Sequence, residues 1–396
     1  MDQKLSRNTG NIQESATVSL GDKVRKLKAE GKYIVPLHTG DPDFATPAPI
    51  TRAAMQAIND GHTHYSHSRG LPELREAISQ ELLETTGAFY RSEDEILITN
   101  GGIHACFTAL TAILDEGDEV LVPTPIWTSH INVIKMAHGK PVIVGSTPGK
   151  RFIPSVEDLE NAITAKTKAI IINSPNNPTG AVLSQEDVNG IIRLAEAHNL
   201  YIIADEVYNA ILFDGHVHHS FAAAAASKDN IILVNSFSKT YAMTGWRIGY
   251  LAAPTEVIDQ ALKVSQFSIT NVPAFTQIAA LEALQNPEVK AQVDIMMKAY
   301  QKRADLVMQL AEHYKNPLVN ITKPEGAFYF FVGTQELNWG DSIATANRLL
   351  DVYGIASVPG SSFGDCGEGY LRMTIAASDR HVEEGFRKLL ESTPLL

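Results

Sequence analysis

Ile231-Ile-Leu-Val-Asn-Ser-Phe-Ser-Lys239, continuing as Thr240-Tyr-Ala-Met-Thr-Gly-Trp-Arg247, is the segment that decides the fold. Its opening residues are apolar and mostly β-branched, which predicts a buried strand. Lys239 comes just past that strand, and open α/β sheets carry out their chemistry outside the carboxyl ends of their strands. A lysine becomes a Schiff-base former when burial or nearby charge lowers its pKa, normally about 10.4, by as much as ~3–5 units. Taken alone, the segment fits an ordinary surface lysine at least as well.

The composition is that of a globular protein with an acidic balance. At roughly 150 residues per domain, 396 residues predict two or three units. Hydrophobic residues make up 44% and the formal net charge is −12, which argues against general affinity for nucleic acid or anionic membranes. The N-terminus has no apolar signal segment, and no apolar run reaches the ~18 residues of a membrane span. We therefore expect a cytoplasmic protein.

The cysteines and histidines give no metal-binding pattern. Cys106 and Cys366 lie far apart and form no CxxC motif, so neither a zinc site nor a disulfide framework is predicted. Histidines cluster within residues 62–67 and 216–219, but they lack cysteine or acidic partners at ligand spacing. We expect no bound metal.

Strands and helices alternate through the middle of the chain. Apolar runs predict strands at residues 119–123, 141–144, 168–173, 201–205, 231–234 and 250–254. Helices are predicted at residues 20–30, 71–86 and 184–198, the last opening with the capping-box pattern Ser184-Gln-Glu-Asp187. This alternation predicts a mostly parallel sheet covered by helices on both faces.

The last third of the chain has a different pattern. A charged amphipathic stretch from residue 287 to about 314 predicts one long helix, or two in tandem, that bridges two domains. The apolar segment 326–332 follows, and then helices near residues 342–353 and 379–391. We expect a smaller α+β unit here.

Asp205 ends the predicted strand 201–205, and Tyr208 follows three residues later. A strand-end carboxylate often only caps the next turn. In the same crevice as Lys239, however, it suits a cofactor that has an aldehyde and a pyridine nitrogen. The carboxylate would keep that nitrogen protonated and make the ring an electron sink.

The segment Asn173-Ser-Pro-Asn-Asn-Pro-Thr-Gly180 follows the predicted strand 168–173. Such residues dominate turns, so a simple turn is the alternative interpretation. The amide of Asn177 could donate to a phenolate oxygen of the cofactor. The bond between Asn177 and Pro178 is a candidate cis peptide.

Two further features suit anions. Glycines in Thr99-Asn-Gly-Gly-Ile103 precede a predicted helix, where free N–H groups attract a phosphate, although a tight turn explains them as well. With Ser236, Ser238 and Arg247 they would form a monophosphate cup. The GxGxxG and GxxxxGK[ST] patterns are absent, so dinucleotide and P-loop sites lose their usual support. Arg372 suits bidentate binding of a carboxylate, with a surface ion pair as the alternative.

In order along the chain, these motifs resemble those of a fold type I, class I/II aminotransferase of the aspartate aminotransferase superfamily, which uses pyridoxal 5′-phosphate. The similarity covers nearly the whole length. The motifs that carry it are Gly40-Asp-Pro-Asp-Phe44, Tyr65, Gly70-Leu-Pro-Glu-Leu-Arg75, Asn100-Gly-Gly102, Pro125-Ile-Trp127, Asn177-Pro-Thr-Gly180, Asp205-Glu-Val-Tyr208, Ser236-Phe-Ser-Lys239, Gly245-Trp-Arg247, Pro324-Glu-Gly-Ala-Phe-Tyr329, Pro359-Gly-Ser-Ser-Phe-Gly364 and Leu371-Arg372.

The resemblance implies a role for each matching residue. Lys239 would form the Schiff base with the cofactor aldehyde and then move the substrate proton, and Asp205 would pair with the pyridine nitrogen. Tyr208 and Asn177 would hold the 3-hydroxyl oxygen, and Trp127 would stack on the ring. The phosphate would be held by Gly102, Ile103, Ser236, Ser238 and Arg247.

The resemblance also implies a substrate clamp, a dimer and a domain division. Arg372 would bind the substrate α-carboxylate with Asn177 and the Gly40 backbone, and Tyr65 would reach the phosphate of a neighbouring subunit in a homodimer. A large domain of residues 49–290 would hold a mostly parallel, seven-stranded-type sheet between helices. Residues 1–48 and 291–396 would form a smaller α+β domain from both chain ends.

The pocket for the substrate side chain departs from the family pattern. Aspartate-specific relatives of one branch carry an arginine shortly before an Asn-x-Pro segment, and this chain has none in residues 265–273. Another branch has a lysine directly after the Gly-Gly pair, where this chain has Ile103. We therefore expect an L-amino acid with a neutral side chain to be preferred over aspartate or glutamate, with a 2-oxo acid as acceptor.

Other functions stay open at this point. A basic donor, an aspartate aminotransferase, a carbon–sulfur lyase, a cyclopropane-forming synthase and an oxidase would share the same anchor residues. A regulatory protein on this fold usually carries an added DNA-binding module, for which the sequence leaves no room before Gly40.

Overall fold

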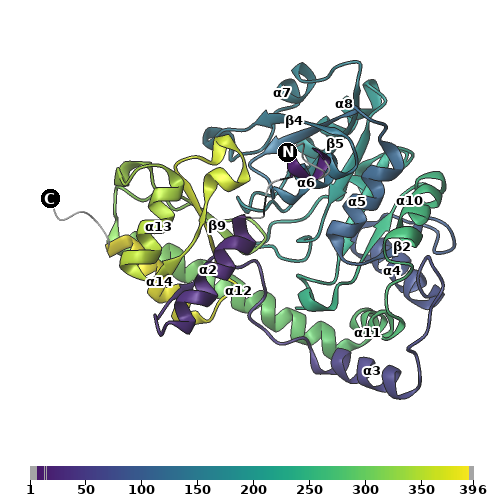
Figure 1. The fold of residues 1–396 in the computed structure, drawn as a ribbon, viewed down its shortest axis with the longest axis horizontal. Coiled ribbons are helices and arrows are strands. Elements are labelled where there is room, and N and C mark those ends of the chain that lie inside the picture. The colour runs from purple at the N-terminus through teal and green to yellow at the C-terminus, as the bar shows by residue number, and fades with distance from the viewer. Residues whose placement is uncertain (1–6, 13, 15, 392–396) are drawn as a thin grey trace, which may run out of the picture.

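The computed structural model describes residues 7–12, 14 and 16–391 (Figure 1). Its largest feature is a seven-stranded sheet in the order β2-β8-β7-β6-β5-β3-β4. Strand β8 runs antiparallel to the other six strands of this sheet. The strands are β2 (Ile96–Thr99), β3 (Glu119–Thr124), β4 (Lys140–Gly145), β5 (Thr167–Asn173), β6 (Tyr201–Asp205), β7 (Ile231–Ser236) and β8 (Gly249–Ala252).

Both faces of this sheet are buried, which explains why its strands are near-continuous apolar runs. In β5, Ala169 and Ile171 join the apolar core on one face, and Ile170 and Ile172 join the core on the other. The first core is closed by α5 (Gly102–Ile113), α6 (Ser129–Met136) and α10 (Thr255–Ser268). The second is closed by α3 (Ala48–Asn59), α4 (Pro72–Thr86), α7 (Val156–Asn161), α8 (Gln185–Ala197), α9 (Phe221–Ala224) and α11 (Ala274–Gln285).

The local signals in the sequence act as expected. Gly87 ends α4 with φ 81°, a left-handed conformation that suits glycine. The side chain of Ser184 accepts from the Asp187 backbone at the start of α8, and the reciprocal bond completes the capping box. The prediction of a cis bond between Asn177 and Pro178 is wrong. The cis peptide bonds among the described residues are Thr124–Pro125 and Ser174–Pro175.

A second, smaller set of elements packs beside the large sheet. Its three strands, β9 (Tyr329–Gly333), β11 (Val358–Pro359) and β12 (Tyr370–Thr374), form an antiparallel sheet in the order β11-β12-β9. Helices α13 (Ser342–Tyr353) and α14 (Asp379–Glu391) belong to the same part of the molecule (Figure 1). The N-terminal segment joins this part, since β1 (Val35–Pro36) pairs in parallel with β10 (Ile355–Ala356). Helix α2 (Ala16–Ala29) packs through Val24 in an apolar cluster with Leu350 and Ala356.

One helix connects the two parts. The long α12 (Pro287–Tyr314) contacts α14 at one end of its path and α3 and α11 at the other (Figure 1). The predicted fold class, a mostly parallel sheet between helices with a smaller α+β part built from both chain ends, is thereby confirmed. The domain limits at residues 48/49 and 290/291 stay a prediction. Within the described residues, no helix is both long and apolar enough to cross a membrane.

Candidate active site

A cavity of about 460 Å³ lies at the carboxyl ends of β5, β6 and β7. Because parallel strands end at one edge of the sheet, residues that are distant in sequence meet there. The small antiparallel sheet contributes Tyr329 and Arg372 to the same cavity. Every residue that the sequence singled out lines it except Tyr65: Gly40, Gly102, Ile103, Trp127, Asn177, Asp205, Tyr208, Ser236, Ser238, Lys239, Arg247 and Arg372.

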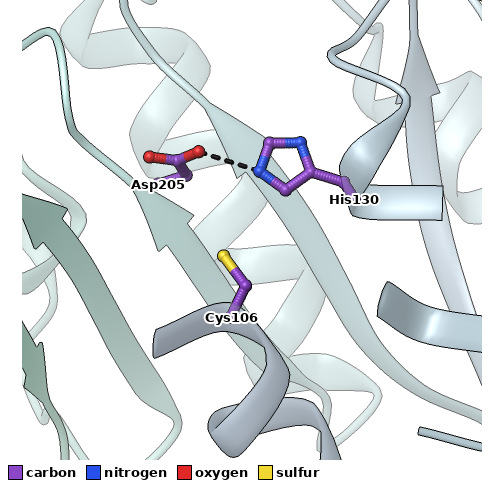
Figure 2. A group of neighbouring side chains, drawn as sticks. All are labelled: Cys106, His130 and Asp205. Carbon is purple, nitrogen blue, oxygen red and sulfur yellow. Dashed lines mark hydrogen bonds and ion pairs between the residues drawn. The ribbon is translucent and has the colours of Figure 1, made fainter. Parts of the chain in front are cut away.

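Asp205 lies on the floor of the cavity, where its side chain is fixed by two donors. The Nε2 of the buried His130 lies 2.8 Å from Asp205 Oδ2, and the backbone N–H of Val207 donates to Oδ1 at 3.3 Å (Figure 2). Two bonds in different directions fix the position of the carboxyl group. Sequence reasoning missed His130. Its only signal was a position three residues after Trp127, whose ring it meets edge-on at 5.6 Å.

Cys106 lies beside this pair (Figure 2). Ligand atoms of Cys106, His130 and Asp205 all lie within 4.8 Å of one another, a spacing that a metal ion could bridge. Burial, together with the Asp205 charge, raises the pKa of the Cys106 thiol well above its ordinary value. A thiol in that state is a weak metal ligand, because the thiolate is the form that binds. The absence of a metal stays a prediction.

Lys239 follows β7 and points its amine at the opposite wall. Its Nζ donates to the Gly40 carbonyl at 2.5 Å. Burial, aided by the charges of Arg372 and Arg247, lowers the pKa of Lys239 to about 8 against the opposing effect of Asp41. A lysine in this range is partly unprotonated near neutral pH, as nucleophilic and proton-transfer roles require.

An anion-binding pocket forms where α5 begins. Gly101 caps the helix with φ 81°, and a Cβ there would lie 2.6 Å from Arg247 Nη2. Glycine is therefore required both by the backbone conformation and by the approach of the guanidinium. Ser236 and Ser238 line the same end of the cavity, so N–H groups, hydroxyls and one cation converge as a phosphate group needs.

Arg372 is a buried cation with one unpaired N–H group. It is 2% exposed, and its Nη1 and Nη2 donate to Asn177 Oδ1 at 3.0 Å and to the His38 carbonyl at 2.8 Å. Its Nε has no partner, and no carboxylate in the described part of the chain pairs with it. Burial lowers the pKa of Arg372. A buried guanidinium without a counter-ion favours a carboxylate ligand.

Tyr208 and Tyr329 form a pair beside Arg372. Their hydroxyl oxygens are 2.9 Å apart, and the Arg372 guanidinium lies 4.4 Å from the Tyr329 ring centre. Burial raises the pKa of both tyrosines, so both remain neutral hydrogen-bonding groups. Sequence reasoning quoted Tyr329 within a motif but gave it no role. Its place in the site depends on the register of β9 against β12, where it pairs with Thr374, two residues beyond Arg372.

Tyr65 does not join the cavity of its own chain. Its side chain is 86% exposed. The predicted contact of Tyr65 with a phosphate would need a second subunit, and it stays a prediction.

The arrangement fits pyridoxal 5′-phosphate. It presents a fixed carboxyl group that could pair with the pyridine nitrogen, an amine of lowered pKa, a helix N-terminus that could hold the phosphate and a buried arginine that could bind a carboxylate.

Residues 32–389 match the family described as "Aminotransferase class I and II", and the chain belongs to that family. It is similar to the aspartate/prephenate aminotransferase of Thermus thermophilus, with 39% identity over 98% of this chain and 97% of that protein. The probable aspartate/prephenate aminotransferase of Aquifex aeolicus is 38% identical over 98% of both chains.

The solved structures agree. The aspartate aminotransferase of Thermus thermophilus with maleate superposes with a TM-score of 0.93 at 37% identity, covering 98% of this chain and 99% of that one. The aromatic aminotransferase of Pyrococcus horikoshii gives a TM-score of 0.87 at 36% identity, covering 94% and 98%. The predicted family, the transaminase activity and the cofactor pyridoxal phosphate are confirmed.

Proposed function

We propose that this aminotransferase takes the amino group of an L-amino acid with a neutral side chain, in preference to aspartate or glutamate, and passes it to a 2-oxo acid. The cations that line the cavity carry the argument. Among its described lining residues these are Lys239, Arg247 and Arg372, and each has a task in handling the cofactor or the substrate α-carboxylate. None is left for a second substrate carboxylate.

The remaining wall supports the same preference. Ile103 follows the Gly101-Gly102 pair at the start of α5, and α2 brings Val18 to the cavity. Both side chains are aliphatic. A distal carboxylate placed against them would lose water without gaining a partner, and uncompensated burial of a charge is strongly unfavourable.

The chain's own groups divide the chemistry. Pyridoxal phosphate, when bound, supplies an aldehyde that condenses with amines and a ring that accepts electron density from the substrate α-carbon. Arg372, with Asn177, orients the α-carboxylate. Lys239 in its unprotonated form would take the substrate α-proton and later release it, because an amine with a pKa of about 8 can act as a base near neutral pH. Asp205, held by His130, would accept a hydrogen bond from the protonated ring nitrogen.

The other predicted residues complete the cofactor site. Tyr208, held by Tyr329, and Asn177 would donate to the 3-hydroxyl oxygen, and Trp127 would cover the ring. The phosphate would be held by Gly102, Ile103, Ser236, Ser238 and Arg247. We further propose a cytoplasmic homodimer in which Tyr65 completes the partner's phosphate site, since its exposed side chain lies outside its own cavity.

The second candidate is an aspartate aminotransferase, and the names of several relatives favour it. Steady-state kcat/KM values for alanine, leucine, methionine, phenylalanine and aspartate, each with pyruvate and with 2-oxoglutarate, separate the two. We expect at least one neutral donor to exceed aspartate. A value for aspartate above those of all four neutral donors overturns the proposal. In a separate assay with an S-alkylcysteine and no oxo acid, release of ammonia, pyruvate and the thiol would indicate a lyase.

Ile103 offers a matched pair of variants. Ile103→Lys supplies the missing cation and should raise kcat/KM for aspartate by roughly 10- to 100-fold, because a hydrogen bond to a charged group contributes about 1.5–3 kcal/mol. Ile103→Met keeps the wall apolar and should not. Equal aspartate rates in both variants would remove Ile103 from the specificity argument.

A further inference from the structure

A second cavity, of about 250 Å³, lies behind the active site. We call it the rear cavity. It is formed by one face of α4, the loop of residues 209–218 and the ends of β7 and β8. Ser236 lines both cavities, so a single layer of residues separates them. The transamination chemistry derived above makes no use of this space.

A buried carboxylate–histidine pair lies beside the rear cavity. His218 Nε2 lies 2.9 Å from Glu206 Oε2, and both side chains are almost fully buried. The other oxygen of Glu206 accepts from Ser220 Oγ at 3.0 Å and from the Phe221 backbone N–H at 3.1 Å. His218 lines the cavity, but its unpaired Nδ1 is itself covered by protein, so this pair packs beside the cavity and offers no open nitrogen to a ligand.

A carboxylate without an ion pair lies across the rear cavity. Glu81 of α4 is half-buried, and among the described residues it forms no ion pair. Burial and the neighbouring Glu84 raise the pKa of Glu81, while Lys290 acts on it only at longer range. None of the described lining residues is a lysine or an arginine. The rear cavity therefore offers one carboxyl acceptor, Glu81, and no competing cation among its described lining residues.

The rest of the lining is apolar and aromatic. Phe237, Tyr241 and Tyr250 contribute rings, and Phe237 and Tyr241 lie 5.6 Å apart between ring centres. Ring faces attract cations, and the attraction increases when the site excludes water. Aliphatic side chains of α4, such as Ile78 and Leu82, complete the wall.

We propose that the rear cavity binds a small organic cation: a protonated amine with an apolar or aromatic body and no carboxylate. Its N–H group would donate to Glu81, and its body would lie against the aromatic rings. An amino acid is excluded, because a carboxylate would find no cation there, whereas the active site provides Arg372. The ligand class thus differs from that of the transamination substrates.

The probe is N,N-dimethyl-2-phenylethylamine, titrated calorimetrically into the holoenzyme. A tertiary amine cannot condense with the cofactor aldehyde, so its binding is not confused with reaction at the Lys239 site. The controls are 2-phenylethanol, which has no charge, and L-phenylalanine in the presence of a saturating carboxylate inhibitor of the active site. We expect one amine per chain and no binding of either control to the rear cavity.

Glu81→Gln should weaken amine binding roughly tenfold or more, because a charge-assisted hydrogen bond is lost. Glu84→Gln, an exposed neighbour on the same helix, is the matched control and should bind as the wild type does. The proposal is overturned if millimolar amine gives no binding, if the alcohol binds as well as the amine, or if Glu81→Gln binds with unchanged affinity. A crystal structure with the amine in the active site instead would also overturn it.

Discussion

Gly40→Ala tests how tightly the active site is packed. A Cβ at this position would lie 2.3 Å from the Tyr329 hydroxyl oxygen and 3.4 Å from Tyr329 Cζ. Only the contact with the hydroxyl oxygen is too short to exist, and the Tyr329 hydroxyl group must therefore move away. It then loses its hydrogen bond to Tyr208, 2.9 Å long in the wild type. The Gly40 carbonyl also accepts from Lys239, so the strain reaches the reactive amine.

The expected cost follows from these contacts. Overpacking in a well-packed region costs about 1–3 kcal/mol, and the lost buried hydrogen bond adds about 1 kcal/mol. We expect Gly40→Ala to lower the free energy of unfolding of the holoenzyme by about 2–4 kcal/mol and to lower kcat/KM. Thermal unfolding and steady-state kinetics with the preferred donor measure the two effects.

A second substitution identifies the cause. Tyr329→Phe removes the oxygen that the new methyl group would strike, while the ring carbons stay at ordinary contact distance. The double variant should therefore be more stable than Gly40→Ala alone, a positive coupling in the double-mutant cycle. The steric clash with Tyr329 is refuted if Gly40→Ala is as stable and active as the wild type. It is also refuted if adding Tyr329→Phe to Gly40→Ala restores no stability.

Three further predictions concern charged groups of the site. Arg372→Lys should reduce kcat/KM for amino acids roughly 10- to 100-fold, because the guanidinium proposed to bind the α-carboxylate through two N–H groups is lost. The rate with a donor amine that has no carboxylate should be unaffected. His130→Asn should weaken cofactor binding by a similar factor, because Asp205 loses the partner that lies 2.8 Å from it. Dialysis followed by absorbance measures the cofactor retained, and unchanged retention would count against a positioning role of His130. In the cofactor-free protein, the pKa of Lys239 is lowered to about 8, so the unfolded state binds more protons between pH 8 and about 10.5. Stability should therefore rise with pH across that window by about 3 kcal/mol relative to Lys239→Met in urea unfolding. Parallel pH profiles of the two proteins would contradict a lowered pKa of Lys239.

The sequence predicted the large sheet well because its strands are buried on both faces. Strands β5, β6 and β7 are short apolar runs, and each is followed directly by polar residues. Parallel strands must end at one edge, so Asn177, Asp205 and Lys239 could be expected to meet without knowledge of any distance. The capping signals at Ser184 and Gly87 are local and equally readable from the sequence.

Contacts that depend on exact register or on packing were not predictable in this way. His130 is a single histidine on a short helix, and its partner lies on a strand far along the chain. Tyr329 enters the site only because β9 and β12 pair in one particular register. The steric need for glycine at position 40 arises from that same tyrosine. Each of these is a property of the assembled fold rather than of a local pattern.

We propose that Lys239 is the amine that reacts with the cofactor aldehyde. Reduction of the holoenzyme with sodium borohydride fixes the cofactor on the lysine that carries it, and proteolysis with mass spectrometry locates the added pyridoxyl phosphate. We predict the label on the peptide that contains Lys239, and none in Lys239→Ala. A label on any other lysine of the wild type, or an unlabelled Lys239 peptide in fully loaded enzyme, would contradict the account.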